Sequence, residues 1–271
     1  MHTKIIQLNP PKILEIQEFS DPSIFLPQWR TYQQGIDQPF HVRDINGVLL
    51  CEEKEPLWGH ICKDLRAVKA VLAQDLEAFK YRDDLEKDNI LADGSLSTEK
   101  LKEAIQEYHD WMNASTLSEK LLRCYYIFIY YHDIGKANGD RADHENKGLQ
   151  KFLALGLQLD EKLYGSKAIE KISWLIKYHG EYREIDKARR ASGKPNDYSD
   201  NLNALFLDLN TIEITSSEKI TLLRLMGLFN FVEGIQSDQF GWTMCRKDTL
   251  YNNEYKYLDI KFHYDQLIKR F

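Results

Sequence analysis

The residues best suited to chemistry in this sequence lie in one short stretch, His132-Asp133-Ile134-Gly135-Lys136, with a further histidine at His144. An adjacent histidine and aspartate at the end of a strongly apolar segment are hard to explain by packing alone. Imidazole nitrogen and carboxylate oxygen are good ligands for divalent transition metals, and carboxylate-rich sites also suit manganese or magnesium. The stretch therefore indicates a metal site.

Four of the eight histidines fall on the predicted inward faces of helices: His60, His132, His144 and His179. A catalytic metal needs three or more such groups to converge, with a coordination position left for water or substrate. Rigid helices hold ligands of this kind at fixed positions. We therefore expect these imidazoles to meet beside Asp133.

The segment that leads into His132 is predicted to be a central, buried helix. Thr116-Leu117-Ser118-Glu119 fits a capping box, and the residues that follow are apolar on almost every side through Tyr131. His132 and Asp133 can both reach one ion only if the backbone turns there. Gly135 is expected to permit that turn through its conformational freedom.

The elements around this helix follow from periodicity and capping signals. Helices are predicted from Leu57 onward, over 144–158, over 166–179, and from a second capping box at Thr215-Ser216-Ser217-Glu218. Three other segments are predicted to be non-helical: a charged loop or insertion over 80–100, an exposed loop over 187–200, and short β-like or mixed segments over 255–262.

The fold class indicated is all-α, a mainly helical bundle with a small β or irregular N-terminal extension. Residues 1–55 form the extension, in which Asn46-Gly47 suits the tight turn of a hairpin. Residues 56–240 form the helical metal-binding domain. Residues 241–271 form a C-terminal segment packed on it.

Composition narrows the class of protein. A net charge of −6 over 271 residues provides no positive field, so long nucleic acid is not an expected partner. The four cysteines include no CxxC pair, which argues against a disulfide framework or zinc ribbon. The N-terminus lacks the pattern of a signal peptide, and no apolar run approaches the length of a membrane span. We expect a cytoplasmic protein with no membrane partner; an oligomer is left open.

Over roughly residues 56–240 the chain resembles the HD-domain superfamily of metal-dependent phosphohydrolases. His132-Asp133 with Ile134-Gly135-Lys136 matches the defining motif, His144-Glu145 with Gly148 is similar to the third element, and Ile176–Gly180 is similar to the fourth. The first histidine of the pattern has two candidates. We favour His60, on an amphipathic helix, over His109, which lies closer to the motif in the chain.

The closing aspartate of the family pattern is replaced by asparagine in Leu228-Phe229-Asn230-Phe231-Val232-Glu233. Asparagine offers a neutral oxygen, a weaker ligand than carboxylate. The resemblance implies one or two divalent transition ions (Mn, Fe, Ni, Co or Zn). The first would be held by His60, His132, Asp133 and Asn230, and the second would be completed by His144 and His179, with Asp133 able to bridge the two.

The function implied by the resemblance is hydrolysis of a phosphate ester or anhydride, with Asp133 and Lys136 as catalytic residues. The substrate class is a nucleotide or related small phosphate, including a cyclic or short oligonucleotide. Lys136 is expected to contact substrate phosphate as a point charge, although a lysine at a helix end is also favoured by the helix dipole alone. Arg183 opens a basic run with Lys187, Arg189 and Arg190, and is the second expected substrate contact.

Three other functions stay open from the sequence. Some two-iron members of the superfamily resemble oxygenases, which would use the same ligands for a different reaction. A catalytically decayed ligand-binding or scaffold protein would explain the asparagine at the closing position. The third is a nuclease that acts together with a nucleic-acid partner protein.

Overall fold

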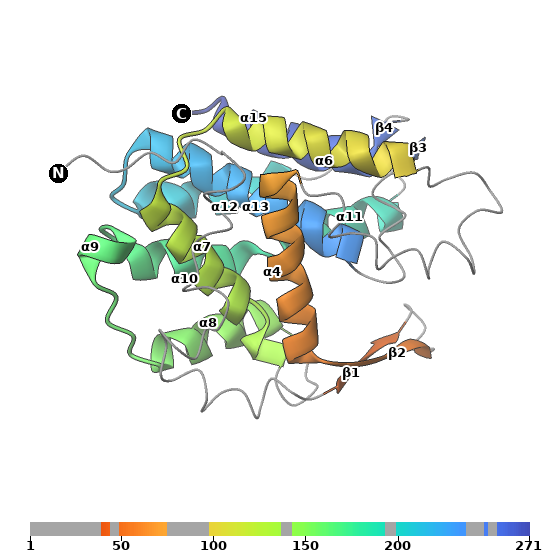
Figure 1. Cartoon of the computed structure of the whole chain (residues 1–271), viewed down its shortest axis with the longest axis horizontal. Helices are drawn as coiled ribbons and strands as arrows, with labels where there is room; N and C mark the ends of the chain where they lie inside the picture. The colour runs from red at the N-terminus through yellow and green to blue at the C-terminus, as the bar shows by residue number, and fades with distance from the viewer. Residues whose placement is uncertain are drawn as a thin grey trace.

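The computed structural model describes residues 39–43, 49–74, 98–136, 143–192, 199–236, 247–248 and 254–271. Within these ranges, the side chains of 39–63, 66, 98–101, 199–201, 236, 247–248 and 254–255 lie outside the description. The protein is an all-α helical bundle, as predicted from the sequence, with short strand pairs attached to it. Figure 1 shows α4 standing near the middle, with α6 and α15 lying side by side across one end.

Helix α7 (Glu119–Tyr131) is the centre of the bundle, as predicted. Every residue from Leu121 to Tyr131 is buried, and the helix packs against α4 (Leu57–Ala73), α9 (Glu161–Tyr164) and α10 (Ala168–Tyr178). Its N-cap is Ser118, whose hydroxyl accepts a hydrogen bond from Leu121 N at 3.2 Å. The prediction that Thr116 caps this helix is therefore wrong, because Ser118 already satisfies the amide that a cap serves.

Helix α13 (Ser216–Gln236) packs against α4 and also contacts α7, where Tyr125 OH donates to Leu225 O at 3.0 Å. The predicted capping box at its start is confirmed: Thr215 N donates to Glu218 Oε2 and Glu218 N donates to Thr215 Oγ1, both at 3.2 Å. Helices α6 (Thr98–Asn113) and α15 (Lys256–Ile268) cover it, with the Tyr108 and Phe231 rings stacked at 4.1 Å. The β-like segments predicted over 255–262 are wrong, because most of that range is helical.

Helices α11 (Glu181–Ser192) and α12 (Ser199–Thr211) replace most of the loop predicted over 187–200, so that prediction is wrong. Arg189 is fully buried, and its Nη1 donates to Asp259 Oδ2 on α15 at 2.6 Å. Tyr182 OH donates to the same oxygen at 2.7 Å, and His263 contacts both Arg189 and Asp259. The basic residue that looked solvated in the sequence instead fastens α11 to α15.

The 3-10 turn η4 (Ile134–Lys136) lies directly against α8 (His144–Ala154). A Cβ at Gly135 would lie 1.9 Å from His144 O and 2.7 Å from Gly148 N. The described glycines with positive φ are Gly156 and Gly165, and Gly135 is not one of them. The expected reason for Gly135 is therefore wrong: close approach of two backbones requires it, and a special backbone conformation does not.

The hairpin predicted in the N-terminal extension is present as two antiparallel strands, β1 (Pro39–Arg43) and β2 (Leu49–Pro56), with Phe40 opposite Glu53. The predicted Asn46-Gly47 turn lies outside the described residues, as does most of the charged stretch 80–100. Strand β2 runs directly into α4. A second pair, β3 (Lys247–Asp248) and β4 (Glu254–Tyr255), precedes α15. In the described ranges, no helix combines the length and hydropathy that a bilayer span requires.

Substituting Gly135 by alanine should disrupt the contact between η4 and α8. The new methyl group would meet backbone atoms that cannot rotate away, so we expect a loss of more than about 3 kcal/mol in the free energy of unfolding. Gly148→Ala is the matched control, since its Cβ would meet its nearest atoms at 3.4 Å. Alanine also suits the interior of α8, so the control should stay within about 1 kcal/mol of the wild type. Urea unfolding of both variants measures this, and equal stabilities would contradict the close-approach argument.

Asp259→Asn should show how far the junction of α11 with α15 depends on charge. Burial raises the pKa of Asp259, but His263 and Arg189 together bring it below its usual value. A depressed folded-state pKa means that the ionised carboxylate stabilises the fold above about pH 4, and that this contribution disappears as pH falls through the lower folded value. The variant should therefore be about 3 kcal/mol less stable than wild type near pH 7, a gap that narrows below pH 4. Denaturant unfolding of both proteins from pH 3 to 7 measures the gap, and a pH-independent gap would refute the ionic contribution.

Candidate metal centre

Three helices deliver side chains to one buried point beside Asp133. His132 is the C-cap of α7 and Asp133 follows it, His144 is the first residue of α8, and His179 is the C-cap of α10. The contact of η4 with α8 brings His144 to Asp133, and the packing of α10 against α7 and α8 adds His179. Residues far apart in the sequence therefore meet because helix ends converge.

The tightest group consists of Asp133, His144 and His179, all buried. Asp133 Oδ1 lies 3.5 Å from the Nε2 atoms of both histidines. Around an ion bound at about 2.1 Å, tetrahedrally arranged ligand atoms stand about 3.4 Å apart. The observed separations fit that spacing, so this group can hold a metal ion.

His132 and Asp64 lie on the other side of the same carboxylate. His132 Nε2 is 3.4 Å from Asp133 Oδ2 and 3.7 Å from Asp64 Oδ2, and all three side chains are fully buried. Asp64 was not assigned to the site from the sequence. Its position one turn after His60 on α4 is the signal that could have identified it.

All three imidazoles present Nε2 to the carboxylate. The Nδ1 atoms of His132 and His179 lie 2.7 Å from the backbone carbonyls of Ile129 and Ile176, which can only accept, so each Nδ1 carries the proton. The Nδ1 of His144 instead faces Glu145 Oε2 at 3.1 Å. Ligand lone pairs are thereby directed toward the place where an ion would lie.

The charge states suit metal binding as well. Burial raises the pKa of Asp133, but the Lys136 ammonium and His132 lower it well below its usual range, so the carboxylate is ionised. Burial, reinforced by Lys136, lowers the pKa of His144 to about 3, so that ring is neutral at physiological pH. An ionised carboxylate and a neutral imidazole are the protonation states that a metal requires.

Lys136 is part of this centre. Its ammonium lies 2.6 Å from Asp133 Oδ2, and its side chain is 7% exposed. The two oxygens of Asp133 therefore differ, because Oδ2 is engaged by a cation while Oδ1 faces His144 and His179. The expected contact between Lys136 and substrate phosphate stays a prediction.

Arg183 lies in the first turn of α11, where its Nη2 donates to Glu145 Oε1 at 3.1 Å. Burial lowers the pKa of Arg183, but Glu233, Glu145 and Asp133 raise it above its usual value. Burial raises the pKa of Glu233, whereas Arg183 and Lys136 bring it below its usual value. Glu233 was not assigned to the site from the sequence. It lies one turn beyond Phe229, whose ring packs 4.8 Å from that of His132.

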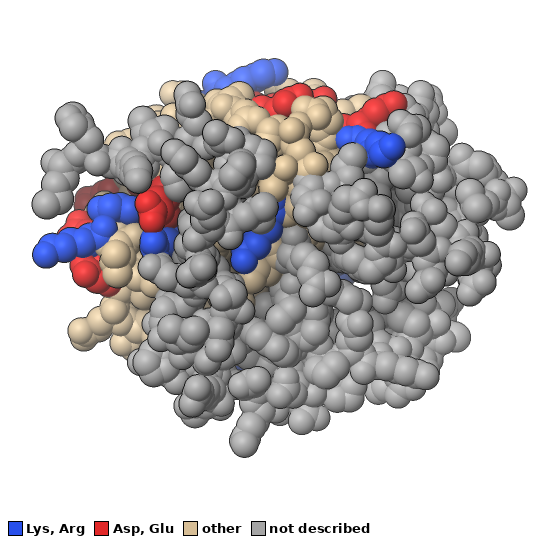
Figure 2. All heavy atoms as spheres, viewed as in Figure 1, with Lys and Arg blue, Asp and Glu red and all other residues tan. Residues whose placement is uncertain are grey.

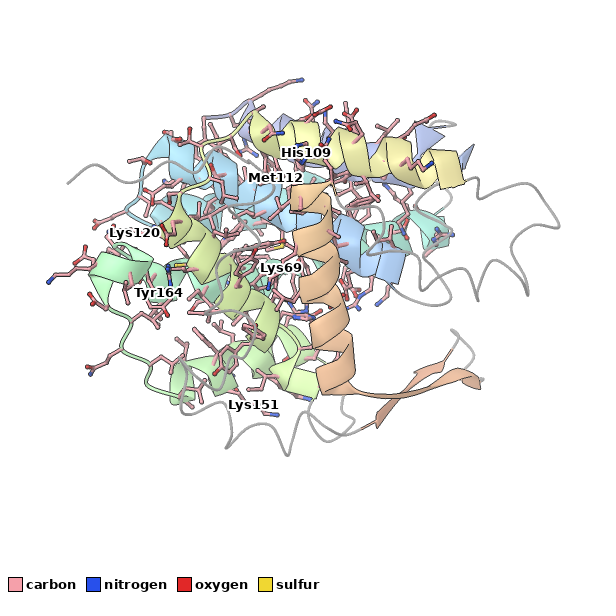
Figure 3. All side chains as sticks on the ribbon, in the orientation of Figure 1. Lys69, His109, Met112, Lys120, Lys151 and Tyr164 are labelled. Carbon is pink, nitrogen blue, oxygen red and sulfur yellow. The ribbon has the colours of Figure 1, made fainter. Side chains whose placement is uncertain are left out.

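The remaining predicted ligands have different positions. His60 lies on α4 one turn before Asp64, and its side chain is outside the described residues. His109, the alternative first ligand, has its Nδ1 3.3 Å from Val71 O, two turns along α4 from Asp64; Figure 3 shows it on α6 at the far end of α4. Asn230 Nδ2 donates to Met226 O at 2.9 Å and to Tyr264 OH at 3.0 Å, so its amide nitrogen is engaged with α15.

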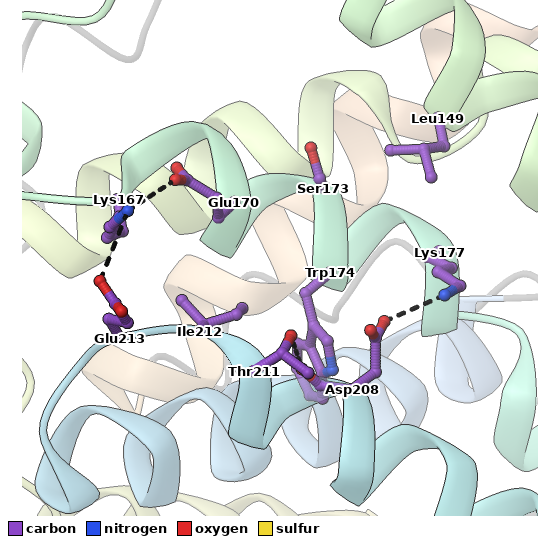
Figure 4. Close-up of a pocket in the computed structure, with 10 residues that line it drawn as sticks. All are labelled: Leu149, Lys167, Glu170, Ser173, Trp174, Lys177, Asp208, Thr211, Ile212 and Glu213. Carbon is purple, nitrogen blue, oxygen red and sulfur yellow. Dashed lines mark hydrogen bonds and ion pairs between the residues drawn. The ribbon is translucent and has the colours of Figure 1, made fainter.

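A separate cavity of about 440 Å³ lies between α10 and α12 and contains none of the predicted site residues. Lys167 pairs with Glu170 and Glu213 at its rim, and Lys177 pairs with Asp208 (Figure 4). On the face drawn in Figure 2, described acidic and basic side chains lie interspersed.

No known family model, curated protein or solved structure matches the chain. The chemistry of the site therefore has to be argued from its own residues.

A divalent ion should stabilise the wild-type protein through the Asp133, His144 and His179 group. At 100 times the dissociation constant, binding contributes about 2.7 kcal/mol, which for a chain of this size corresponds to a rise of several degrees in Tm. Asp133→Asn and His179→Ala should lose this rise because each removes one ligand. Thermal unfolding with and without Mn²⁺, Co²⁺ or Zn²⁺ measures it. His109→Ala, a histidine outside the group, should keep the full rise, and an equal loss there would contradict the assignment.

Proposed function

We propose that this protein is a metal-dependent phosphohydrolase that acts on a nucleotide or a related small phosphate ester or anhydride. The observation that carries the proposal is the set of contacts around the buried, ionised Asp133 carboxylate. The imidazoles of His144 and His179 lie 3.5 Å from its Oδ1, and the Lys136 ammonium lies 2.6 Å from its Oδ2. Asp133 therefore contacts both the candidate metal-binding histidines and Lys136, a cation that can bind a phosphate. The HD-type motif that the sequence resembles supports the same reading.

The ligand set suits a divalent transition metal. Mixed imidazole and carboxylate sites accept Mn, Fe, Ni, Co or Zn, and availability decides among them. When bound, such an ion lowers the pKa of a coordinated water toward neutrality and offsets charge on phosphoryl oxygens. A second ion beside His132 and Asp64 would have to compete with Lys136 for Asp133 Oδ2. We therefore infer that the position at Asp133, His144 and His179 fills first.

The cations at the edge of the centre indicate the substrate chemistry. Lys136 and Arg183 can each meet a phosphate oxygen, Lys136 as a point charge and Arg183 through its planar fork. The carboxylates of Asp133, Glu145 and Glu233 outnumber these two cations, so the centre offers two phosphate contacts without an extended positive surface. That suits a small phosphate better than a long polyanion, in agreement with the net charge of −6.

A second candidate is a ligand-binding protein that holds the same metal without turnover. It is favoured by Asn230, which stands at the closing position of the motif and directs its amide nitrogen to Tyr264. The two candidates differ in one measurable respect. Both would bind metal, but only the first would release phosphate or a nucleoside product.

The test is a screen of nucleotides, cyclic nucleotides and short oligonucleotides with added Mn²⁺, followed by variants assayed on the best substrate. Asp133→Asn and His144→Ala should lower kcat at least about 100-fold, because a metal ligand is lost. Arg183→Ala should raise KM about tenfold with a smaller effect on kcat, since a phosphate contact is removed.

Lys187→Ala is the matched control for Arg183. Lys187 lies one turn further along α11, is 62% exposed and pairs with Glu184. Its removal should leave both constants unchanged. Metal binding without turnover on any phosphate would favour the second candidate, and full activity in Asp133→Asn would refute the first.

A further inference from the structure

Glu145 bridges two members of the site. Its Oε2 lies 3.1 Å from the Nδ1 of His144, and its Oε1 accepts from Arg183 Nη2 at 3.1 Å. Its side chain is 20% exposed, so these contacts are largely shielded from water. One carboxylate thus touches both a group suited to hold a metal and a group suited to hold a phosphate.

The position of His144 explains why a side chain is needed there. His132 and His179 stand at the C-terminal ends of helices, and each finds a backbone carbonyl three residues earlier in its own helix. His144 is the first residue of α8, and Asp143 before it has a left-handed φ of 56°. His144 therefore has no earlier turn of its own helix to supply a carbonyl, and among the described residues the group that faces its Nδ1 is the Glu145 carboxylate.

Gly180 provides the space for this contact. A Cβ at Gly180 would lie 2.2 Å from Glu145 Oε1 and 3.1 Å from its Cδ. The glycine directly follows His179, so the same helix end supplies one imidazole and leaves room for the carboxylate that orients the next. The arrangement involves residues from α8, α10 and α11.

We propose that Glu145 is a positioning residue: it holds the Nδ1 proton of His144, and so fixes the tautomer and ring orientation that present Nε2 to a metal. The proposal rests on the proposed function in that it assigns a role within the same metal centre. Carboxylates that hold the distal nitrogen of a ligating histidine raise its basicity and typically contribute about 10- to 100-fold to metal affinity. Glu145 itself is not a ligand here, since Oε2 faces Nδ1 on the side of the ring away from Nε2.

The test begins with the metal-free full chain and the ¹⁵N resonances of its histidine rings. In the wild type, His132, His144 and His179 should all carry the proton on Nδ1. In Glu145→Ala only His144 should change, becoming a mixture of tautomers, while the other two keep their carbonyl acceptors. Glu145→Gln should restore the Nδ1–H form in part, because the amide oxygen can accept the same proton.

The second readout is the affinity for Co²⁺ alone, measured by calorimetry. It should fall about 10- to 100-fold in Glu145→Ala and less in Glu145→Gln. Gly180→Ala should reproduce the Glu145→Ala result, because it displaces the carboxylate without removing it. Arg183→Ala is the matched control: it breaks the other bond of Glu145 and should leave the His144 tautomer unchanged.

An unchanged His144 tautomer in Glu145→Ala would overturn the proposal, and so would an unchanged Co²⁺ affinity. The two proposals fail separately. Absence of phosphatase activity in the wild type would remove the proposed function and leave the tautomer result standing. An active wild type with no His144 shift in the variant would do the reverse.

Discussion

A buried, ionised carboxylate is the constraint on which this fold and its site depend. An isolated charge in a dry interior is too costly to persist, so Asp133 has to be surrounded by groups that stabilise it. Lys136 supplies a full positive charge at 2.6 Å, and three imidazoles face the two oxygens. Because Lys136 takes Oδ2, the other oxygen is left facing His144 and His179. The asymmetry of one side chain thereby determines where a cation fits best.

The backbone meets this constraint through close packing at one point. The helix that carries His132 is buried from Leu121 to Tyr131, so the end of α7 is fixed by the packing around it. The partners must come to it instead. Gly135 and Gly148 let η4 and α8 approach until their backbones are in contact, which places His144 against Asp133. Both glycines belong to the motif that the sequence displays, but only at Gly135 would a side chain collide with the opposing backbone.

Features that depend on neighbouring residues in the sequence could be predicted, whereas features that depend on contacts between distant residues could not. The apolar run of α7 and the Thr215–Glu218 capping box are local, and both predictions succeed. The loop predicted over 187–200 fails because Arg189 counts as hydrophilic until Asp259, 70 residues away, is known to pair with it. Asp64 and Glu233 were passed over for the same reason: a carboxylate on a helix shows its role only when its neighbours across the bundle are known.

The contacts of Asn230 across the bundle account for the asparagine at the closing position of the motif. Asn230 donates through one nitrogen to a carbonyl of its own helix and to Tyr264, so it joins α13 to α15. The same helix still faces the centre, but through other positions: Phe229 packs against the rings of His132 and His179, and Glu233, one turn on, is coupled to Lys136 and Arg183. Negative charge from α13 therefore reaches the cationic edge of the site from Glu233. A carboxylate at position 230 would lose the hydrogen bond that the Asn230 amide donates to the Met226 carbonyl, because a carboxylate has no N–H to donate.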